Sequence, residues 1–148
     1  MAAEEPGSAG ETEIRALIDR VVHAIRARDV DGVMSAFAPD VVSFDIGPPL
    51  QHGGGPAFAA RWRELFDAYR GPIEYEVHDL DVTADDAVAF SHSLNRIAGT
   101  LENGRTSERW LRWTACYRRV EGRWRIVHEQ VSVPVDPRDG KALLDLKP

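Results

Sequence analysis

The sequence predicts a single α+β domain in which three N-terminal helices pack on one face of a strongly curved antiparallel sheet. Apolar residues recur at helical spacing up to about residue 70 and alternate along the chain from residue 73 to residue 133. Two Pro and three consecutive Gly between residues 46 and 55 mark a loop within the first part. Helices first and strands afterwards is the element order of an α+β domain rather than of a parallel doubly wound sheet.

The helical part begins at about Thr12. From there apolar residues fall on one side of a helix and charged residues on the other, and the apolar side consists of Ile14, Leu17, Ile18, Val21, Val22 and Ile25. Asp29 can cap a second, shorter helix, which Pro39 closes. After a short strand and the Gly-rich loop, Pro56 takes the favoured first position of a third helix, which ends at Gly71.

The second half of the chain is predicted to consist of strands. Apolar residues change parity near His78 and Asp79, which predicts a bulge that bends the first long strand. Residues 105–119 and 123–133 then form an antiparallel hairpin. Helices across the mouth of such a bent sheet enclose a hollow, and a hollow lined by aromatic side chains is the usual site for a small molecule.

Composition narrows the function classes. A net charge of -6, with basic residues interleaved among acids, argues against a nucleic-acid partner. The chain has one Cys and five His without ligand spacing, so we expect no metal and no cofactor. With no membrane-length apolar run and no secretory signal, a soluble cytoplasmic protein is expected. Residues 1–10 are expected to be a disordered lead-in to a single domain over residues 11–148.

The C-terminal half resembles a known family in three segments, AFSHSLNRIAGTLENGR, WLRWTACYRRVEGRWRIVHEQVSVP and GKALLDLKP. They are similar to the SnoaL-like, ketosteroid-isomerase-like proteins of the nuclear transport factor 2-like superfamily, especially the SgcJ/EcaC branch. In the first half, AIRARDVDGVMSAFAPDVVSFD is similar to the helix-to-strand entry of the same superfamily. The resemblance covers roughly residues 12–148 and implies a cone-shaped sheet around the helices. For function it implies an isomerase, a cyclase or a binding protein for natural-product-like molecules.

The resemblance also allows site residues to be compared with those of true ketosteroid isomerases. Asp45 falls where true ketosteroid isomerases keep the carboxylate that shuttles a proton. The places of their oxyanion-hole Tyr and Asp hold Val21 and Trp113, which argues against ketosteroid isomerisation by that mechanism. Where the branch shows a His-x-His-x-Ser run, this chain has His128, Gln130 and Ser132, and the Gln argues against two histidines acting together.

Three residues are candidates for catalysis. Asp45 ends a strand before the Gly-rich loop, where it is either a general base at a cavity mouth or an acid that braces the loop. Glu129 shares its strand face with valines, so burial would raise its pKa toward a range useful for proton transfer. The alternative is a structural ion pair of Glu129 with Arg109 or Arg125. His92 is either a hydrogen-bond donor to a carbonyl or a core histidine.

Strand parity assigns the remaining candidates. Odd-numbered side chains between Arg109 and Val133 are expected to point inward, and the expected ligand wall is Trp62, Phe66, Arg109, Leu111, Trp113 and Val131. Even-numbered residues should form an outer layer, in which Trp110, Arg112, Trp124 and His128 suit a homodimer interface.

Two function classes remain open. The first is a cofactor-independent isomerase or cyclase, in which a carboxylate moves a proton on an apolar, polyketide- or steroid-like carbonyl compound. The second is a non-catalytic carrier or sensor of a small apolar ligand. A structural dimerisation module of the same fold, with a filled interior, is a third alternative.

Overall fold

The computed structural model describes residues 8–148, which form three helices and one five-stranded sheet. The elements in chain order are α1 (Ala9–Arg26), α2 (Val30–Met34), β1 (Phe37–Phe44), α3 (Pro56–Asp67), β2 (Tyr69–Ala84), β3 (Val88–Leu101), β4 (Thr106–Val120) and β5 (Arg123–Ser132). Within this part of the chain, none of the helices combines the length and apolar content needed to cross a membrane.

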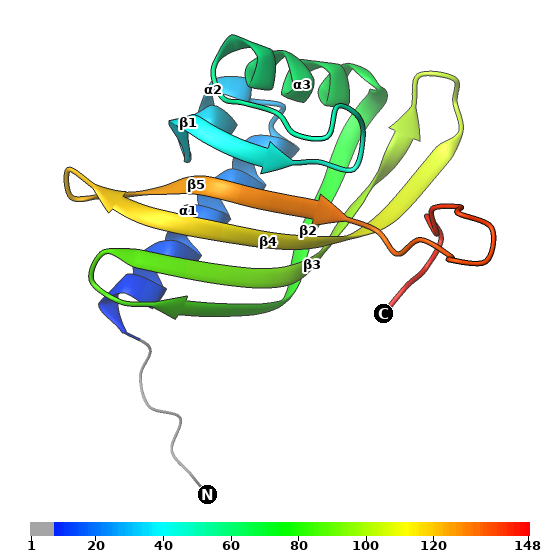
Figure 1. Ribbon diagram of the computed structural model, residues 1–148. Helices are drawn as coiled ribbons and strands as arrows, with labels where there is room; N and C mark the ends of the chain where they lie inside the picture. The colour runs from blue at the N-terminus through cyan, green and yellow to red at the C-terminus, as the bar shows by residue number, and fades with distance from the viewer. Residues whose placement is uncertain (1–7) are drawn as a thin grey trace, which may run out of the picture.

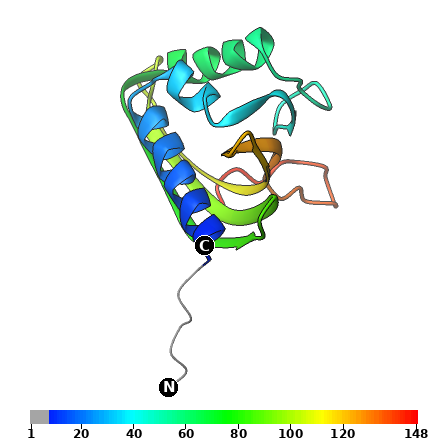
Figure 2. The ribbon, with the colours of Figure 1, turned by 90° about the vertical axis from the view of Figure 1, so that its left-hand side faces the viewer.

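The sheet has the strand order β1-β5-β4-β3-β2. All neighbours are antiparallel except β1, which runs parallel to β5. Figure 1 shows α1 passing across one face of the sheet, with α3 above β1. After a quarter turn, Figure 2 shows α2 and α3 together at one end, with the curved sheet beside α1. The predicted α+β class and its curved sheet are confirmed.

Helix α1 begins earlier than the sequence prediction allowed. Ser8 caps it by accepting a hydrogen bond from the Glu11 backbone amide at 3.1 Å, and Gly10 is buried. The expected lead-in over residues 1–10 is therefore wrong for its last residues, while residues 1–7 lie outside the described part. The Ser-x-x-Glu spacing is the start of a capping box, a signal that could have located this helix start.

The other helix boundaries differ in part from the prediction. Asp29 does cap α2, accepting from the Gly32 amide at 3.0 Å. Pro39 does not close that helix, because the chain already enters β1 at Phe37. Helix α3 starts at Pro56 as predicted but ends at Asp67, before Gly71, because Tyr69 already pairs with Leu101 in the sheet.

Irregular strand pairing bends the sheet. The pairing of β2 with β3 shifts between His78 and Asp81, and Asp79 has a positive φ of 53°, so the predicted bulge is confirmed. At Gly99 the strands approach closely, since a Cβ there would lie 2.9 Å from the Tyr69 ring and 3.0 Å from the Pro72 carbonyl oxygen. The close approach of the two strands thus requires glycine at this position.

A second bulge lies in β5 and was not predicted. Cys116 pairs with His128 while the next residue, Tyr117, pairs with Ile126, so Val127 is an extra residue. Inward-pointing side chains are therefore odd-numbered after Val127 and even-numbered before it. The expectation that odd-numbered side chains point inward is wrong for residues 123–126. Trp124 leaves the predicted outer layer for this reason: it is buried and donates its Nε1 hydrogen to Glu13 of α1 at 2.6 Å.

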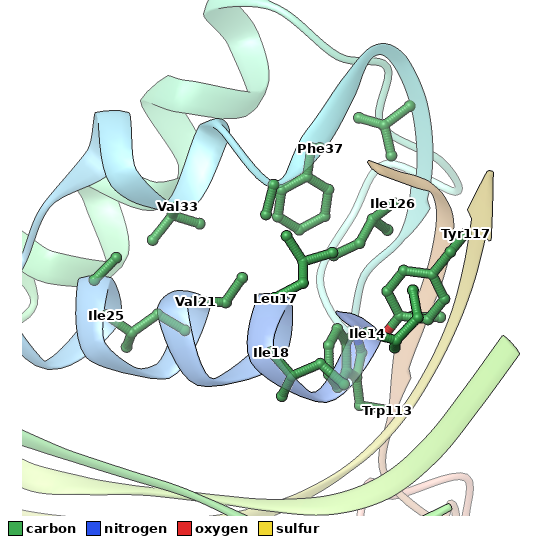
Figure 3. Packing of buried hydrophobic residues seen from close by; sticks show 14 of the residues in the cluster. Ile14, Leu17, Ile18, Val21, Ile25, Val33, Phe37, Trp113, Tyr117 and Ile126 are labelled. Atoms are coloured by element: carbon green, nitrogen blue, oxygen red, sulfur yellow. The ribbon is translucent and has the colours of Figure 1, made fainter. Parts of the chain in front are cut away.

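The core lies between α1 and the concave face of the sheet. Figure 3 shows the α1 side chains directed toward Phe37 of β1, Tyr117 of β4 and Ile126 of β5. The α1 contribution consists of Ile14, Leu17, Ile18, Val21 and Ile25, all of them buried. This is the amphipathic face that the sequence predicted.

The assignment of Trp124 to the core can be tested by two substitutions. Trp124→Ala should lower the free energy of unfolding by about 3 kcal/mol or more, because it leaves a cavity against α1. Trp110→Ala, at a half-buried position on the opposite face, should change it by less than half as much. Urea denaturation of both variants measures the difference, and equal losses would contradict the changed parity.

Candidate functional site

A cavity of about 550 Å³ lies between α1, α3 and the concave face of the sheet. Most of its wall is apolar and aromatic, and this part includes Ile18, Val21, Val22, Phe37, Phe58, Trp62, Leu65, Tyr69, Val77, Ile97, Leu111, Trp113 and Val131. The loop after β1 and Leu144 of the C-terminal tail complete it. The predicted hollow is thus present, and a filled interior is excluded.

Glu129 faces this cavity from β5 and is only 5% exposed. Its Oε2 accepts a hydrogen bond from the Ser43 hydroxyl at 2.7 Å, and its Oε1 accepts from the Trp113 indole at 3.0 Å. Burial raises the pKa of Glu129, although the bonds from Ser43 and Trp113 oppose the rise. The carboxylate therefore has donors on both oxygens, and among residues 8–148 it forms no ion pair.

The alternative ion pairs of Glu129 do not form. Arg109 lies instead 3.5 Å from the exposed Asp145, and Arg125 donates to the Ser35 carbonyl at 3.4 Å. Ser43 was missed by the sequence analysis. Its register position opposite Glu129 in the parallel β1–β5 pair brings the two together, and that pairing has no signal in the local pattern.

Asp45 also lines the cavity, at the point where β1 enters the loop. Its Oδ2 accepts from the Arg61 guanidinium of α3 at 2.7 Å, and its Oδ1 accepts from the Ile46 amide at 2.8 Å. Asp45 therefore braces the loop and borders the cavity, while its role as a general base stays a prediction. Arg61 was not among the predicted site residues, although it lines the same wall.

The inner face of β3 is polar over residues 91–95, which reverses the prediction for His92. Ser91, Ser93 and Asn95 point inward and are buried, whereas His92 is exposed on the outer face with Phe90. His92 is therefore removed from the candidate catalytic residues. The inward polar groups are accommodated because they bond to each other and to tyrosines: Ser91 with Tyr117 at 2.8 Å, Ser93 with Asn95 at 2.7 Å and Asn95 with Tyr75 at 2.7 Å.

Of the six residues expected to form the ligand wall, all but Phe66 line the cavity. These five are Trp62, Arg109, Leu111, Trp113 and Val131. Phe66 does not line the cavity, because it is buried in the core, with its ring centroid 5.9 Å from that of Trp62. Phe66 lies one turn further along the same side of α3 than Trp62, where packed core replaces the cavity wall.

Three of the four predicted interface residues do lie on the outer face of the sheet. Trp110 packs on His78 with 4.9 Å between ring centroids, and Arg112 donates to Ser132 at 3.0 Å. The His128 ring is hydrogen-bonded to the Val42 carbonyl at 2.7 Å. Across residues 8–148, no group of three His, Cys, Asp or Glu side chains is placed to hold a metal ion.

Comparison with known proteins gives matches to one family and to many structures. The model of a family described as a SnoaL-like domain matches residues 14–136. A structure of a nuclear transport factor 2-like protein of unknown function from Pseudomonas putida KT2440 has 38% identity, with a TM-score of 0.84, and covers 93% of this chain and 96% of that one. No curated protein matches.

Two more distant structures share the fold. A ketosteroid isomerase-like protein from Erwinia carotovora atroseptica has 19% identity and a TM-score of 0.70, over 82% of this chain and 94% of that one. A candidate scytalone dehydratase from Novosphingobium aromaticivorans has 11% identity and a TM-score of 0.73, over 82% and 81%. At these identities the similarity concerns the fold alone.

The raised pKa of Glu129 predicts a pH-dependent effect of Glu129→Gln on stability. Because the folded state holds the Glu129 proton more tightly than the unfolded state, this group stabilises the fold at pH below the ordinary carboxyl pKa. That contribution is lost as the pH rises through the raised pKa. Relative to wild type, the Gln variant should therefore gain stability as the pH rises from the ordinary carboxyl range to neutrality.

Urea denaturation at several pH values measures this difference. Gln fits the same two partners, because its carbonyl can accept from Trp113 while its amide donates to the Ser43 oxygen. Gln51→Asn, at an exposed side chain that does not titrate, is the control and should give a pH-independent difference. Parallel curves for wild type and the Glu129 variant would contradict the expected linkage.

Proposed function

Because the chain belongs to the family of SnoaL-like domains, and because Glu129 faces its cavity, we propose that it is an enzyme that moves a proton within a bound apolar carbonyl compound. Glu129 is the proposed general base. The observation that carries the proposal is a buried carboxylate, held by two neutral donors, in the wall of a mostly apolar cavity of about 550 Å³. Carboxylate proton transfer of this kind needs no cofactor.

The proposed step conserves all atoms. The ionised Glu129 removes a proton from the carbon next to the carbonyl. The electron pair of that C–H bond becomes the C=C bond of an enolate, and the π pair of the carbonyl moves onto its oxygen. Return of the proton to another carbon gives an isomer. If a hydroxyl on the neighbouring carbon leaves instead, it takes the proton from Glu129 and departs as water, which gives a dehydration. The raised pKa of Glu129 suits this role, because it strengthens the base.

Asp45 is the second proposed carboxylate. Its ion pair with Arg61 closes the loop side of the cavity, so we assign it the placement of the ligand rather than the main proton transfer. The cavity volume suits a ligand of fused-ring size, such as a polyketide- or steroid-like compound. Cyclase activity, the SgcJ/EcaC branch and a cytoplasmic location stay predictions.

Proton exchange separates this enzyme from a carrier without knowledge of the natural substrate. The probe is 1-tetralone, an apolar bicyclic ketone, in D₂O. Wild type should accelerate exchange of its α-protons for deuterium, as followed by NMR. Glu129→Gln should reduce the protein-dependent rate by roughly 10²- to 10⁴-fold while still binding the ketone.

Asp45→Asn is the companion variant in the exchange experiment. Its protein-dependent exchange should stay within about tenfold of wild type, because Glu129 is retained. A larger loss in Asp45→Asn than in Glu129→Gln would move the base to Asp45. Binding of 1-tetralone without any acceleration of exchange would favour the carrier, and failure of wild type to bind it would contradict the proposed ligand class.

We also propose that two copies of the chain pair through the outer face of the sheet, in a layer that contains Trp110, Arg112 and His128. Phe90, Cys116 and His128 are aligned across β3, β4 and β5 on this face. Phe90 is 51% exposed there. A second copy would cover this apolar row, which water otherwise contacts.

Sedimentation velocity tests the pairing. Phe90→Glu should weaken self-association at least about tenfold, because a charge would be buried in the interface. Leu50→Glu changes a side chain that is 97% exposed on the loop after β1 and should leave association unchanged. A wild-type monomer at all concentrations would refute the proposal.

A further inference from the structure

A chain of polar groups from β3 and β2 reaches the apolar wall of the cavity. The Ser93 hydroxyl donates to Asn95 Oδ1 at 2.7 Å, and Asn95 Nδ2 donates to the Tyr75 hydroxyl oxygen at 2.7 Å. Asn95 is 1% exposed and lines the cavity together with Tyr75. Because the phenol oxygen is the acceptor in this chain, its own proton is left to donate elsewhere.

Tyr75 is held from two directions. Tyr75 pairs with Ile97 in the β2–β3 register, so Asn95 is its diagonal neighbour on the adjacent strand. The backbone carbonyl of Tyr75 accepts from Arg26 Nε at 2.9 Å and from Arg26 Nη2 at 2.6 Å, which ties it to the end of α1. A donor fixed in this way needs no reorganisation when a ligand enters.

We propose that Tyr75 donates a hydrogen bond to the carbonyl oxygen of the bound compound, with Asn95 and Ser93 as the residues that position it. The inference rests on the proposed function, because it supplies the electrophilic partner of Glu129. It also assigns a donor to the role that Val21 and Trp113 leave open, since Val21 has no polar group and the Trp113 indole is bonded to Glu129.

Glu129 and Tyr75 have different roles in the proposed proton transfer. When Glu129 removes the α-proton, the C–H electron pair becomes the C=C bond of the enolate and the carbonyl π pair moves onto the oxygen. The Tyr75 hydroxyl stabilises the negative charge there without giving up its proton. Burial raises the pKa of Tyr75, opposed by the Asn95 bond and reinforced by the charge of Glu129, so the phenol stays protonated at neutral pH. The Asn95 amide on its oxygen also makes its O–H the stronger donor.

The other two tyrosines are less suited to this role. Tyr117 bonds to Ser91 at 2.8 Å and is buried in the core cluster rather than in the cavity wall. Tyr69 does line the cavity, but its hydroxyl lies beside the Ser107 side chain. Tyr69→Phe is therefore a matched control for Tyr75→Phe, because both remove one phenol oxygen from the same wall.

Infrared difference spectroscopy of bound 1-tetralone tests the proposal directly. With ¹²C and ¹³C carbonyl labels, the carbonyl band of the bound ketone should lie at lower wavenumber in wild type and in Tyr69→Phe than in Tyr75→Phe. In Asn95→Leu the phenol remains but is no longer held, so the band should lie between these positions. Deuterium exchange should fall by roughly 10²- to 10³-fold in Tyr75→Phe, as for loss of one oxyanion donor.

The two readouts separate this inference from the proposed function. A shifted band without α-proton exchange would support the Tyr75 donor and reject proton transfer by Glu129. Exchange in wild type together with equal bands in wild type and Tyr75→Phe would reject the Tyr75 donor alone, and would mean that the phenol proton is turned toward Asn95. Circular dichroism confirms that each variant is folded before its spectrum is interpreted.

Discussion

The contact on which the site depends is the pair of hydrogen bonds that Glu129 accepts inside the protein. Ser43 lies on β1 and Trp113 on β4, so one buried carboxylate joins three strands of the sheet. An isolated carboxylate in an apolar wall would be strongly destabilising, and these two donors make its burial tolerable. Neither donor carries a positive charge, so the pKa of Glu129 stays raised rather than lowered. The geometry that stabilises the residue therefore also keeps it basic.

The bulge at Val127 divides β5 into a part that packs in the core and a part that lines the cavity. Before it, Trp124 and Ile126 pack against the rest of the core, and after it Glu129 and Val131 border the cavity. A strand without the extra residue would send one of these pairs to the outer face. The β2 bulge at Asp79 bends the opposite side of the sheet around α1. The curvature of the sheet and the position of the site residues thus both depend on these two bulges.

Local sequence patterns located most of the elements but only part of the site. Helical periodicity and Pro56 placed the helices, and Glu129 was recognisable because it stood among valines. The inward face of β3 was misassigned because apolar residues such as Phe90 point to the exterior while Ser93 and Asn95 point inward. Such a reversal is stable only through bonds to distant residues, Tyr75 and Tyr117, which no local pattern contains. The same holds for the pairing of Asp45 with Arg61.

The polar residues of the cavity favour the proposed enzyme over a non-catalytic carrier. A carrier of an apolar ligand gains little from a buried carboxylate whose pKa is raised, because its ionised form makes the fold less stable at neutral pH. It gains as little from an asparagine used to orient a tyrosine, since a single donor would suffice to hold a carbonyl. A base and a separate, fixed donor in one apolar enclosure are what enolate formation requires, one group for the proton and one for the charge.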